Sequence, residues 1–269
     1  MEDEILVTER RALPDRRHIA HHPMLGDLRA ALATGTVAIF FQPQFRADGC
    51  LSGAEALARW EHPVHGVLAG DALVEIAESG GIECTLSHHV LHEALAHATK
   101  WPEGLRVSVN VTATDLSDPD FASDVEAALS SCNFPADRLT LEITEQALVS
   151  DLDLSAERLS RLAEQGIRIA LDDFGAGFCN FRYLKLLPLD ALKLDKSMVD
   201  GITEDERDLA ILRGIVAMAH ALRLCVTAEG IESEGQRQLV IAEGCDKWQG
   251  FLGGRPMAAN EFARLAANG

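Results

Sequence analysis

Short apolar runs alternate with helical patterns along most of this chain of 269 residues, and no other feature constrains its fold as strongly. The runs have the length and composition of β-strands, and amphipathic stretches of helical length separate most of them. Strands that alternate with helices form βα units around a parallel sheet. We predict strands at VAIFFQPQF, SGAEALARW, RVSVNV, LTLEIT, IRIALDDF, DALKLD, LCVTAEG and DKWQGF. About eight strands in a chain of this length favour an α/β fold, the closed (β/α)₈ or TIM barrel, over an open doubly wound sheet.

The first two predicted strands are joined in a different way from the others. The segment RADGC, residues 46–50, links them through a short Asp-Gly turn, which is a hairpin signal. One strand pair is therefore expected to be antiparallel, and the predicted fold is a modified TIM barrel with an antiparallel first strand.

The N-terminal segment has no core pattern. Residues 1–23 are predicted to be a tail or the end of a linker, and residues 24–269 the folded domain. His18, His21 and His22 in this segment are interpreted as solvated side chains rather than as a metal site. The stretch MLGDLRAALATG follows and predicts an amphipathic helix that ends at Gly35.

Composition limits the compartment and the class of ligand. No apolar run is long enough to span a bilayer, and the charged N-terminus lacks the apolar region of a signal peptide, so we expect a cytoplasmic protein without membrane insertion. Six scattered cysteines without a CxxC pair are expected to be reduced and mostly structural. The formal net charge of −18 disfavours a nucleic-acid polymer as partner, because most of the surface would repel phosphate. A phosphorylated ligand would need local cations.

Polar side chains recur at or near the carboxyl ends of the predicted strands, where barrel enzymes place their chemistry. Glu55 lies within an otherwise apolar strand, and a buried, unpaired carboxylate is either costly or neutralised, so this residue needs compensation. Any single member of the set could be a satisfied polar group of the core, but packing does not explain their recurrence on seven strands. The set is Glu55, Asn110, Glu142, Asp172 with Asp173, Lys193, Glu229 and Gln249.

Carboxylates together with an amide suit hard divalent cations such as Mg²⁺ or Mn²⁺. The adjacent Asp172 and Asp173 suggest two ions, because a shared carboxylate and its neighbour can serve metals roughly 3.5–4 Å apart. Two such ions support in-line attack of water on a phosphodiester and let an acidic protein hold an anion. Lys193, the one cation of the set, could orient or activate the water.

The same residues stand in motifs that resemble those of the EAL-domain family of bacterial cyclic di-GMP-specific phosphodiesterases. The segment AEALARW resembles the family's signature, and the resemblance runs from about Met24 to the C-terminus. The other matching motifs follow in family order and are FFQPQF, VSVNVT, LEITEQ, LDDFGAGF, LPLDALKLDKSMV, TAEGIES and QGFLGGRPM. The resemblance implies a modified barrel that hydrolyses one phosphodiester bond of cyclic di-GMP to linear pGpG, and so lowers this second messenger in bacterial signalling. It also implies a homodimer.

The resemblance implies roles at the matching positions. Glu55, Asn110, Glu142 and Asp172 resemble the ligands of one metal ion, and Asp172, Asp173 and Glu229 the surroundings of the second. Lys193 matches the lysine associated with the nucleophilic water, and Glu145 the glutamate that anchors the loop after the fifth predicted strand. Gln42 and Arg59 match substrate contacts, and Glu232 and Gln249 match supporting polar groups of the substrate site.

One segment departs from the family pattern. The loop after Asp173 reads FGAGFCNF, residues 174–181, where the family commonly has Thr between the glycines and Tyr-Ser-Ser after them. Because this loop links the metal site to dimer contacts in the family, the rate and its regulation could differ here. No cyclase half and no sensor segment is recognisable, so regulation is expected from a protein partner, another subunit or a sensor domain outside this sequence.

Two other functions compete with the enzyme. A catalytically weak or inactive receptor would bind cyclic di-GMP and relay binding to a protein partner, but such relatives usually lose metal ligands or the lysine, and this sequence keeps them. A purely protein-binding regulator would not need the polar set at all.

Overall fold

The computed structural model describes residues 22–148, 151–177 and 181–268. Most of the predicted N-terminal tail, including His18 and His21, therefore lies outside the described residues, as do residues 178–180 of the loop FGAGFCNF. Within the described ranges no helix is both long enough and apolar enough to cross a membrane.

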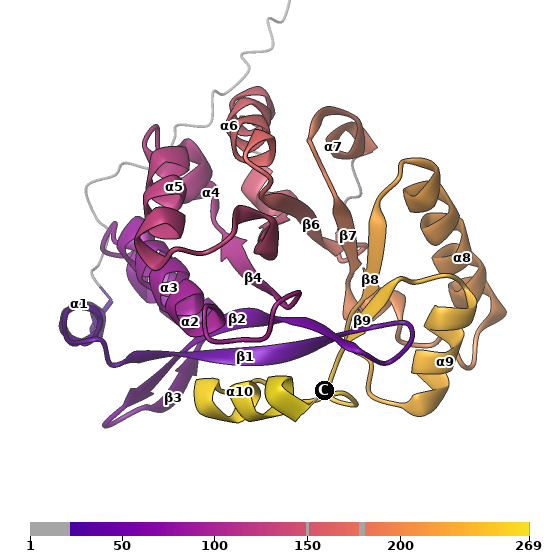
Figure 1. Ribbon diagram of the computed structural model, residues 1–269, viewed down its shortest axis with the longest axis horizontal. Coiled ribbons are helices and arrows are strands. Elements are labelled where there is room, and N and C mark those ends of the chain that lie inside the picture. The colour runs from indigo at the N-terminus through magenta and orange to yellow at the C-terminus, as the bar shows by residue number, and fades with distance from the viewer. Residues whose placement is uncertain (1–21, 149–150, 178–180, 269) are drawn as a thin grey trace, which may run out of the picture.

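Eight strands close into a barrel, as the sequence predicts. Its strands are β1 (Val37–Arg46), β2 (Leu51–His62), β4 (Arg106–Val111), β5 (Leu139–Thr144), β6 (Arg168–Phe174), β7 (Ala191–Leu194), β8 (Cys225–Ala228) and β9 (Lys247–Gln249). Neighbouring strands from β2 through β4 to β9 pair in parallel, whereas β1 is antiparallel to β2 on one side and to β9 on the other. The expected antiparallel first strand is thus confirmed, and it closes the barrel (Figure 1).

Two further strands were not predicted from the sequence. The strand β3 (Gly66–Ala69) pairs with the end of β2, and β10 (Met257–Ala258) pairs with β1, so the sheet has ten strands in all. Both are too short to produce a recognisable hydrophobic period. They extend the sheet at β1 and β2, outside the ring of parallel strands.

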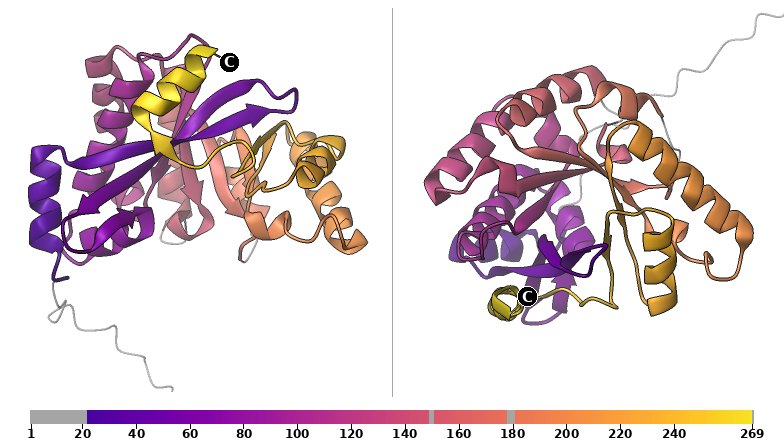
Figure 2. Two further views of the ribbon diagram at one scale, coloured as in Figure 1. Left: turned by 90° about the horizontal axis from the view of Figure 1, so that it is seen from below. Right: turned by 45° about the vertical axis from the view of Figure 1, so that its right-hand side comes forward.

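Helices surround the barrel on its outside (Figure 2). They are α1 (Leu25–Thr34), α2 (Gly70–Glu78), α3 (Glu83–Ala98), α4 (Ala113–Ser117), α5 (Phe121–Cys132), α6 (Leu152–Glu164), α7 (Phe181–Leu186), α8 (Glu206–Ala221), α9 (Glu234–Ala242) and α10 (Ala259–Asn268). Three 3₁₀ turns occur at η1 (Ala136–Arg138), η2 (Glu145–Leu148) and η3 (Lys196–Met198). The helix α1 ends as predicted, because Gly35 takes a left-handed conformation with φ 67° that favours glycine.

An aromatic cluster fixes the C-terminal helix to the barrel. The ring of Trp101 lies with its centroid 5.0 Å from that of Phe41 on β1 and 4.5 Å from that of Phe262 on α10. Both phenylalanines are fully buried. The helix α10, yellow in Figure 1, consequently lies along β1, the strand that closes the barrel.

The cysteines of the described part of the chain form no disulfide with one another. Cys50, Cys84, Cys132, Cys225 and Cys245 are all free, and Cys179 lies outside the described residues.

Candidate metal centre at the carboxyl ends of the strands

Two groups of three carboxylates converge at the carboxyl ends of the parallel strands. Glu55, Glu142 and Asp172 form the first group, in which one carboxylate oxygen from each residue lies within 4.8 Å of the other two. Asp172, Asp173 and Glu229 form the second group by the same criterion. Asp172 belongs to both, as expected for a carboxylate shared between two ions.

The backbone at the end of β6 lets two consecutive aspartates serve one site. Neighbouring residues of a regular strand point to opposite faces, so Asp172 and Asp173 would normally diverge. Here the register between β6 and β7 shifts between Leu171 and Phe174, and Asp173 has a left-handed φ of 54°. Such conformations in residues other than glycine are costly and cluster at functional sites.

Lys193 stands among the carboxylates and is almost fully buried. Its Nζ lies 2.7 Å from Glu142 Oε2, 2.8 Å from Glu229 Oε1, 3.0 Å from Asp172 Oδ1 and 3.7 Å from Glu55 Oε2. Burial by itself would lower the pKa of this lysine, but the four carboxylates raise it well above its usual value. In the metal-free protein Lys193 is therefore protonated and can donate hydrogen bonds.

Two amides orient Glu55. Nδ2 of Asn110 donates to Glu55 Oε1 at 2.9 Å, and Nε2 of Gln249 donates to Oε2 at 2.7 Å. Burial alone would raise the pKa of Glu55, but Lys193 and these two hydrogen bonds hold it below its usual value. The carboxylate thus has the compensation that its position in an apolar strand requires. The amide oxygen of Gln249 is buried without a hydrogen-bond partner among the described atoms.

The remaining carboxylates carry an unfavourable excess of negative charge. Burial and neighbouring carboxylates raise the pKa of Glu142 to about 8 and that of Asp173 to about 6, and they raise the pKa of Glu229 well above its usual value. Five ionised carboxylates beside the single ammonium of Lys193 would leave four negative charges, which two divalent cations would neutralise. The oxygen donors and this charge excess fit hard ions such as Mg²⁺ or Mn²⁺.

A groove of about 650 Å³, counting its open mouth, runs beside the carboxylates. Gln42, Glu232 and Gln249, three of the predicted substrate-site residues, line it together with Glu55 and Glu229. Gln42 stands opposite Glu55 in the register of β1 and β2, and Glu232 is exposed with its Oε1 2.6 Å from Lys196 Nζ. The groove also contains Lys196 and Phe251, which the sequence analysis did not single out although both belong to quoted motifs.

Two predicted site residues lie outside both this groove and the carboxylate cluster. Arg59, four residues after Glu55 on β2, donates from Nη1 to the carbonyl oxygen of Ala58 at 2.8 Å. Glu145 begins the turn η2, which contacts β6. The loop that Glu145 is expected to anchor lies partly outside the described residues, so this role stays a prediction.

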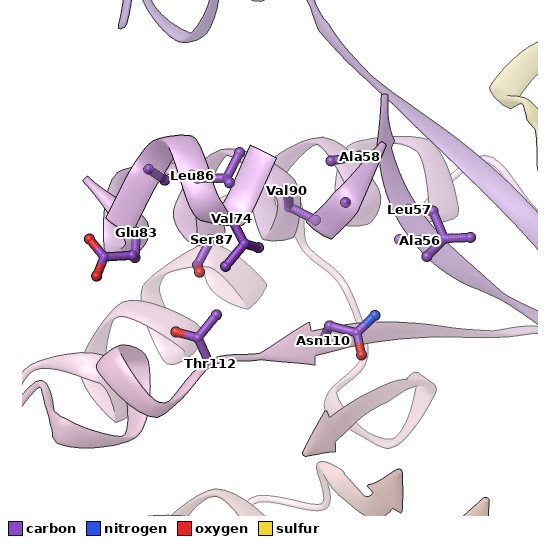
Figure 3. Close-up of a pocket in the computed structure, with 12 residues that line it drawn as sticks. Ala56, Leu57, Ala58, Val74, Glu83, Leu86, Ser87, Val90, Asn110 and Thr112 are labelled. Atoms are coloured by element: carbon purple, nitrogen blue, oxygen red, sulfur yellow. The ribbon is translucent and has the colours of Figure 1, made fainter. Parts of the chain in front are cut away.

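An apolar pocket adjoins the metal centre at Asn110 (Figure 3). It lies between β2, α2, α3 and the end of β4, and has a volume of about 540 Å³ counting its open side. Leu57, Val74 and Val90 give it an apolar wall that no sequence motif had indicated.

Comparison with known proteins adds an independent finding. A family model described as the EAL domain matches residues 25–256. The chain is 36% identical over 249 residues to the bifunctional diguanylate cyclase/cyclic di-GMP phosphodiesterase MucR of Pseudomonas aeruginosa, an alignment covering 91% of this chain and 36% of that protein. It is 38% identical over 246 residues to the cyclic di-GMP phosphodiesterase NbdA of the same organism, covering 88% of this chain and 31% of that protein.

A solved structure described as the PaMucR phosphodiesterase in complex with c-di-GMP has the same fold. It is 34% identical in sequence, has a TM-score of 0.83, and its alignment covers 90% of this chain and all of that chain. The present chain spans about a third of the length of the curated relatives that it matches.

Proposed function

The chain belongs to the EAL domain family, and we propose that it is a metal-dependent phosphodiesterase that hydrolyses cyclic di-GMP to linear pGpG. The observation that carries this proposal is the contact of Lys193 with carboxylates from both groups of candidate ligands. The arrangement combines oxygen ligands for two ions with one hydrogen-bond donor. Two ions can activate a water and hold the phosphate oxygens during phosphodiester hydrolysis.

The metal ligands are proposed residue by residue. Glu55, Asn110, Glu142 and Asp172 would hold one ion, and Asp172, Asp173 and Glu229 the other. Bound Mg²⁺ or Mn²⁺ would neutralise phosphate charge and lower the pKa of a coordinated water. The shared position of Asp172 and the charge excess of the cluster support two ions rather than one.

Lys193 is proposed to position the attacking water and to stabilise charge on the phosphate. As an ammonium group it would donate hydrogen bonds to the water and to the phosphate oxygens, and the surrounding carboxylates hold it protonated in the metal-free protein. In the reaction the water oxygen forms a bond to phosphorus while the bond from phosphorus to the 3′ oxygen breaks. The phosphate remains on the 5′ end of the linear product, and the step balances because the water loses one proton and the 3′ oxygen gains one.

The groove and the apolar pocket are proposed to hold the dinucleotide. Gln42, Glu232 and Gln249 would contact it from the groove, with Lys196 and Arg59 supplying positive charge at the edges. A purine base has apolar faces, and the pocket beside Asn110 offers it an apolar wall next to the reacting phosphate.

The compartment, the oligomeric state, the domain bounds and the regulation are also proposals. We infer a cytoplasmic homodimer in which residues 24–269 form the catalytic domain and residues 1–23 a tail or linker. Because the curated relatives are much longer, a sensor domain or protein partner is the expected source of regulation.

The experiment is a product assay with purified protein and cyclic di-GMP in Mg²⁺, in Mn²⁺ and with a chelator. The proposal expects linear pGpG only where a divalent ion is present. Tight binding of intact cyclic di-GMP without hydrolysis in every condition would instead identify the protein as a receptor. In that case the loop FGAGFCNF, which departs from the family pattern, would be the first segment to test for the loss of activity.

A further inference from the structure

A second polar cavity lies inside the barrel and extends from the amino ends of the strands to Glu142 and Lys193 of the carboxylate cluster, which line its inner end. It has a volume of about 700 Å³, counting the part open to solvent. Arg106, Arg168 and Lys247 line it, and each is the first residue of its strand, β4, β6 and β9 respectively. The parallel strands therefore present cations at their amino ends and carboxylates at their carboxyl ends.

These three cations lack carboxylate partners. In the part of the chain that the structure describes, no carboxylate oxygen lies within 4.0 Å of a charged nitrogen of Arg106, Arg168 or Lys247. Nε of Arg106 donates to the carbonyl oxygen of Asp137 at 3.3 Å, and the Asp137 carboxylate favours the Arg106 charge without forming an ion pair with it. Asp190 also lines the cavity, but its Oδ2 accepts the backbone N–H of Ile169 at 3.0 Å.

The cations repel one another in partial burial. Burial lowers the pKa of Lys247, and Arg106 and Arg168 lower it further. Burial likewise lowers the pKa of Arg106, with Arg168 and Arg46 adding to the shift. A cluster of like charges is thus retained at an energetic cost in a protein whose formal net charge is −18.

The inner wall of the cavity offers neutral hydrogen-bonding groups. Gln44, Ser108 and Thr227 are buried and line it, and Thr140 adds another hydroxyl. Hydroxyl and amide donors combined with guanidinium groups match the oxygens of a phosphate. The space greatly exceeds the roughly 30 Å³ that one water molecule takes up in the liquid, so a group of several atoms fits.

From this juxtaposition we propose that the cavity at the amino ends of the strands binds a small phosphate oxyanion, held by Arg106, Arg168 and Lys247. The same chemistry is present in inorganic phosphate and in the phosphate group of a nucleotide. An oxyanion there would neutralise the cations and stabilise the folded barrel. The three cations are not among the proposed metal ligands, so the proposal does not rest on hydrolysis, although Glu142 and Lys193 line the inner end of the same cavity.

The test is a titration of the full chain in the presence of a chelator, so that no metal at the carboxylate end can recruit phosphate. Inorganic phosphate and guanosine monophosphate are the two probes, and calorimetry and thermal melting are the readouts. The wild-type protein is expected to bind at least one of them at one site per chain and to melt at higher temperature. Phosphate binding alone identifies the free ion as the ligand, and tighter binding of the nucleotide identifies the monoester.

Arg168→Gln and Lys247→Gln are the informative variants. Loss of one charge-assisted contact should weaken binding by roughly tenfold or more. Without phosphate, each variant should melt at the same or a higher temperature than the wild type, because a repelling charge has gone. Arg264→Gln and Lys100→Gln, which remove exposed charges elsewhere, should change neither result.

Three results would overturn the proposal. They are the absence of binding by both probes, equal affinity in Arg168→Gln and the wild type, and an equal rise in melting temperature with chloride at the same ionic strength.

Discussion

Nζ of Lys193 lies 3.0 Å from Oδ1 of Asp172, the carboxylate that belongs to both groups of candidate metal ligands. This contact joins the two groups through one protonated donor. It comes from residues at the ends of the adjacent strands β6 and β7, so the barrel itself sets the spacing.

Glu55→Gln should abolish most of the hydrolysis without unfolding the barrel. The change removes a proposed carboxylate ligand while keeping the side-chain volume. Substituting a residue that only supports a metal ligand already lowers activity or metal affinity by about 10–100-fold. We therefore expect kcat to fall by two orders of magnitude or more. The measurements are kcat and melting temperature. Glu61→Gln, an exposed position on the same strand, is the control and should retain full activity. Hydrolysis by Glu55→Gln at the control's rate would exclude a metal role for Glu55.

Lys193→Met should destabilise the metal-free protein strongly. Its four carboxylate neighbours would lose their cation, and breaking a buried ion pair typically costs about 3–5 kcal/mol. Added Mg²⁺ should restore much of this stability, whereas kcat should stay far below wild type with a smaller change in substrate affinity. Denaturant unfolding with and without Mg²⁺ checks the first point. Lys196→Met, which removes an exposed ion pair, is the stability control. An equal loss of unfolding free energy in the two variants would contradict the claim that Lys193 stabilises the carboxylate cluster.

The metal-free protein should lose stability as the pH rises toward 8. The pKa of Glu142 is about 8 in the folded protein, whereas its ordinary value is 4.5. Between these two pH values Glu142 holds a proton in the folded state and has lost it in the unfolded chain. That contribution is complete below pH 4.5 and disappears as the pH passes 8. Melting temperatures in chelator across this range test it. Glu142→Gln should flatten the profile, and a profile unchanged by that substitution would show that other groups are responsible.

Phe262→Ala should loosen the attachment of α10 to the barrel. The ring is fully buried against Phe41 and Trp101, and truncation of such a residue costs about 3–5 kcal/mol. Urea unfolding measures the loss. Phe181→Ala, at an exposed ring, should cost little. Similar costs for the two substitutions would mean that the aromatic cluster does not hold the helix.

The barrel and most of the carboxylate cluster were predictable from the sequence because both depend on local patterns. Strand and helix periods repeat along the chain, and an acid in an apolar strand such as Glu55 is visible without a structure. Long-range geometry was not predictable. The hydrogen bond from Gln249 to Glu55 joins residues 194 positions apart, and the left-handed backbone at Asp173 breaks the alternation that a strand pattern assumes.

The cation cluster escaped the sequence analysis for a related reason. Arg106, Arg168 and Lys247 each stand at the beginning of a strand, where a charged residue usually marks only the transition from loop to strand. Only the closure of the barrel brings the three into one cavity.

The most direct test of the central claim is hydrolysis of cyclic di-GMP in ¹⁸O-labelled water with Mg²⁺, followed by mass spectrometry of the product. The account predicts linear pGpG that carries one ¹⁸O atom in its 5′-phosphate, and no product in chelator. Recovery of bound, unlabelled cyclic di-GMP with no linear product would contradict the account and identify the barrel as a receptor for the dinucleotide.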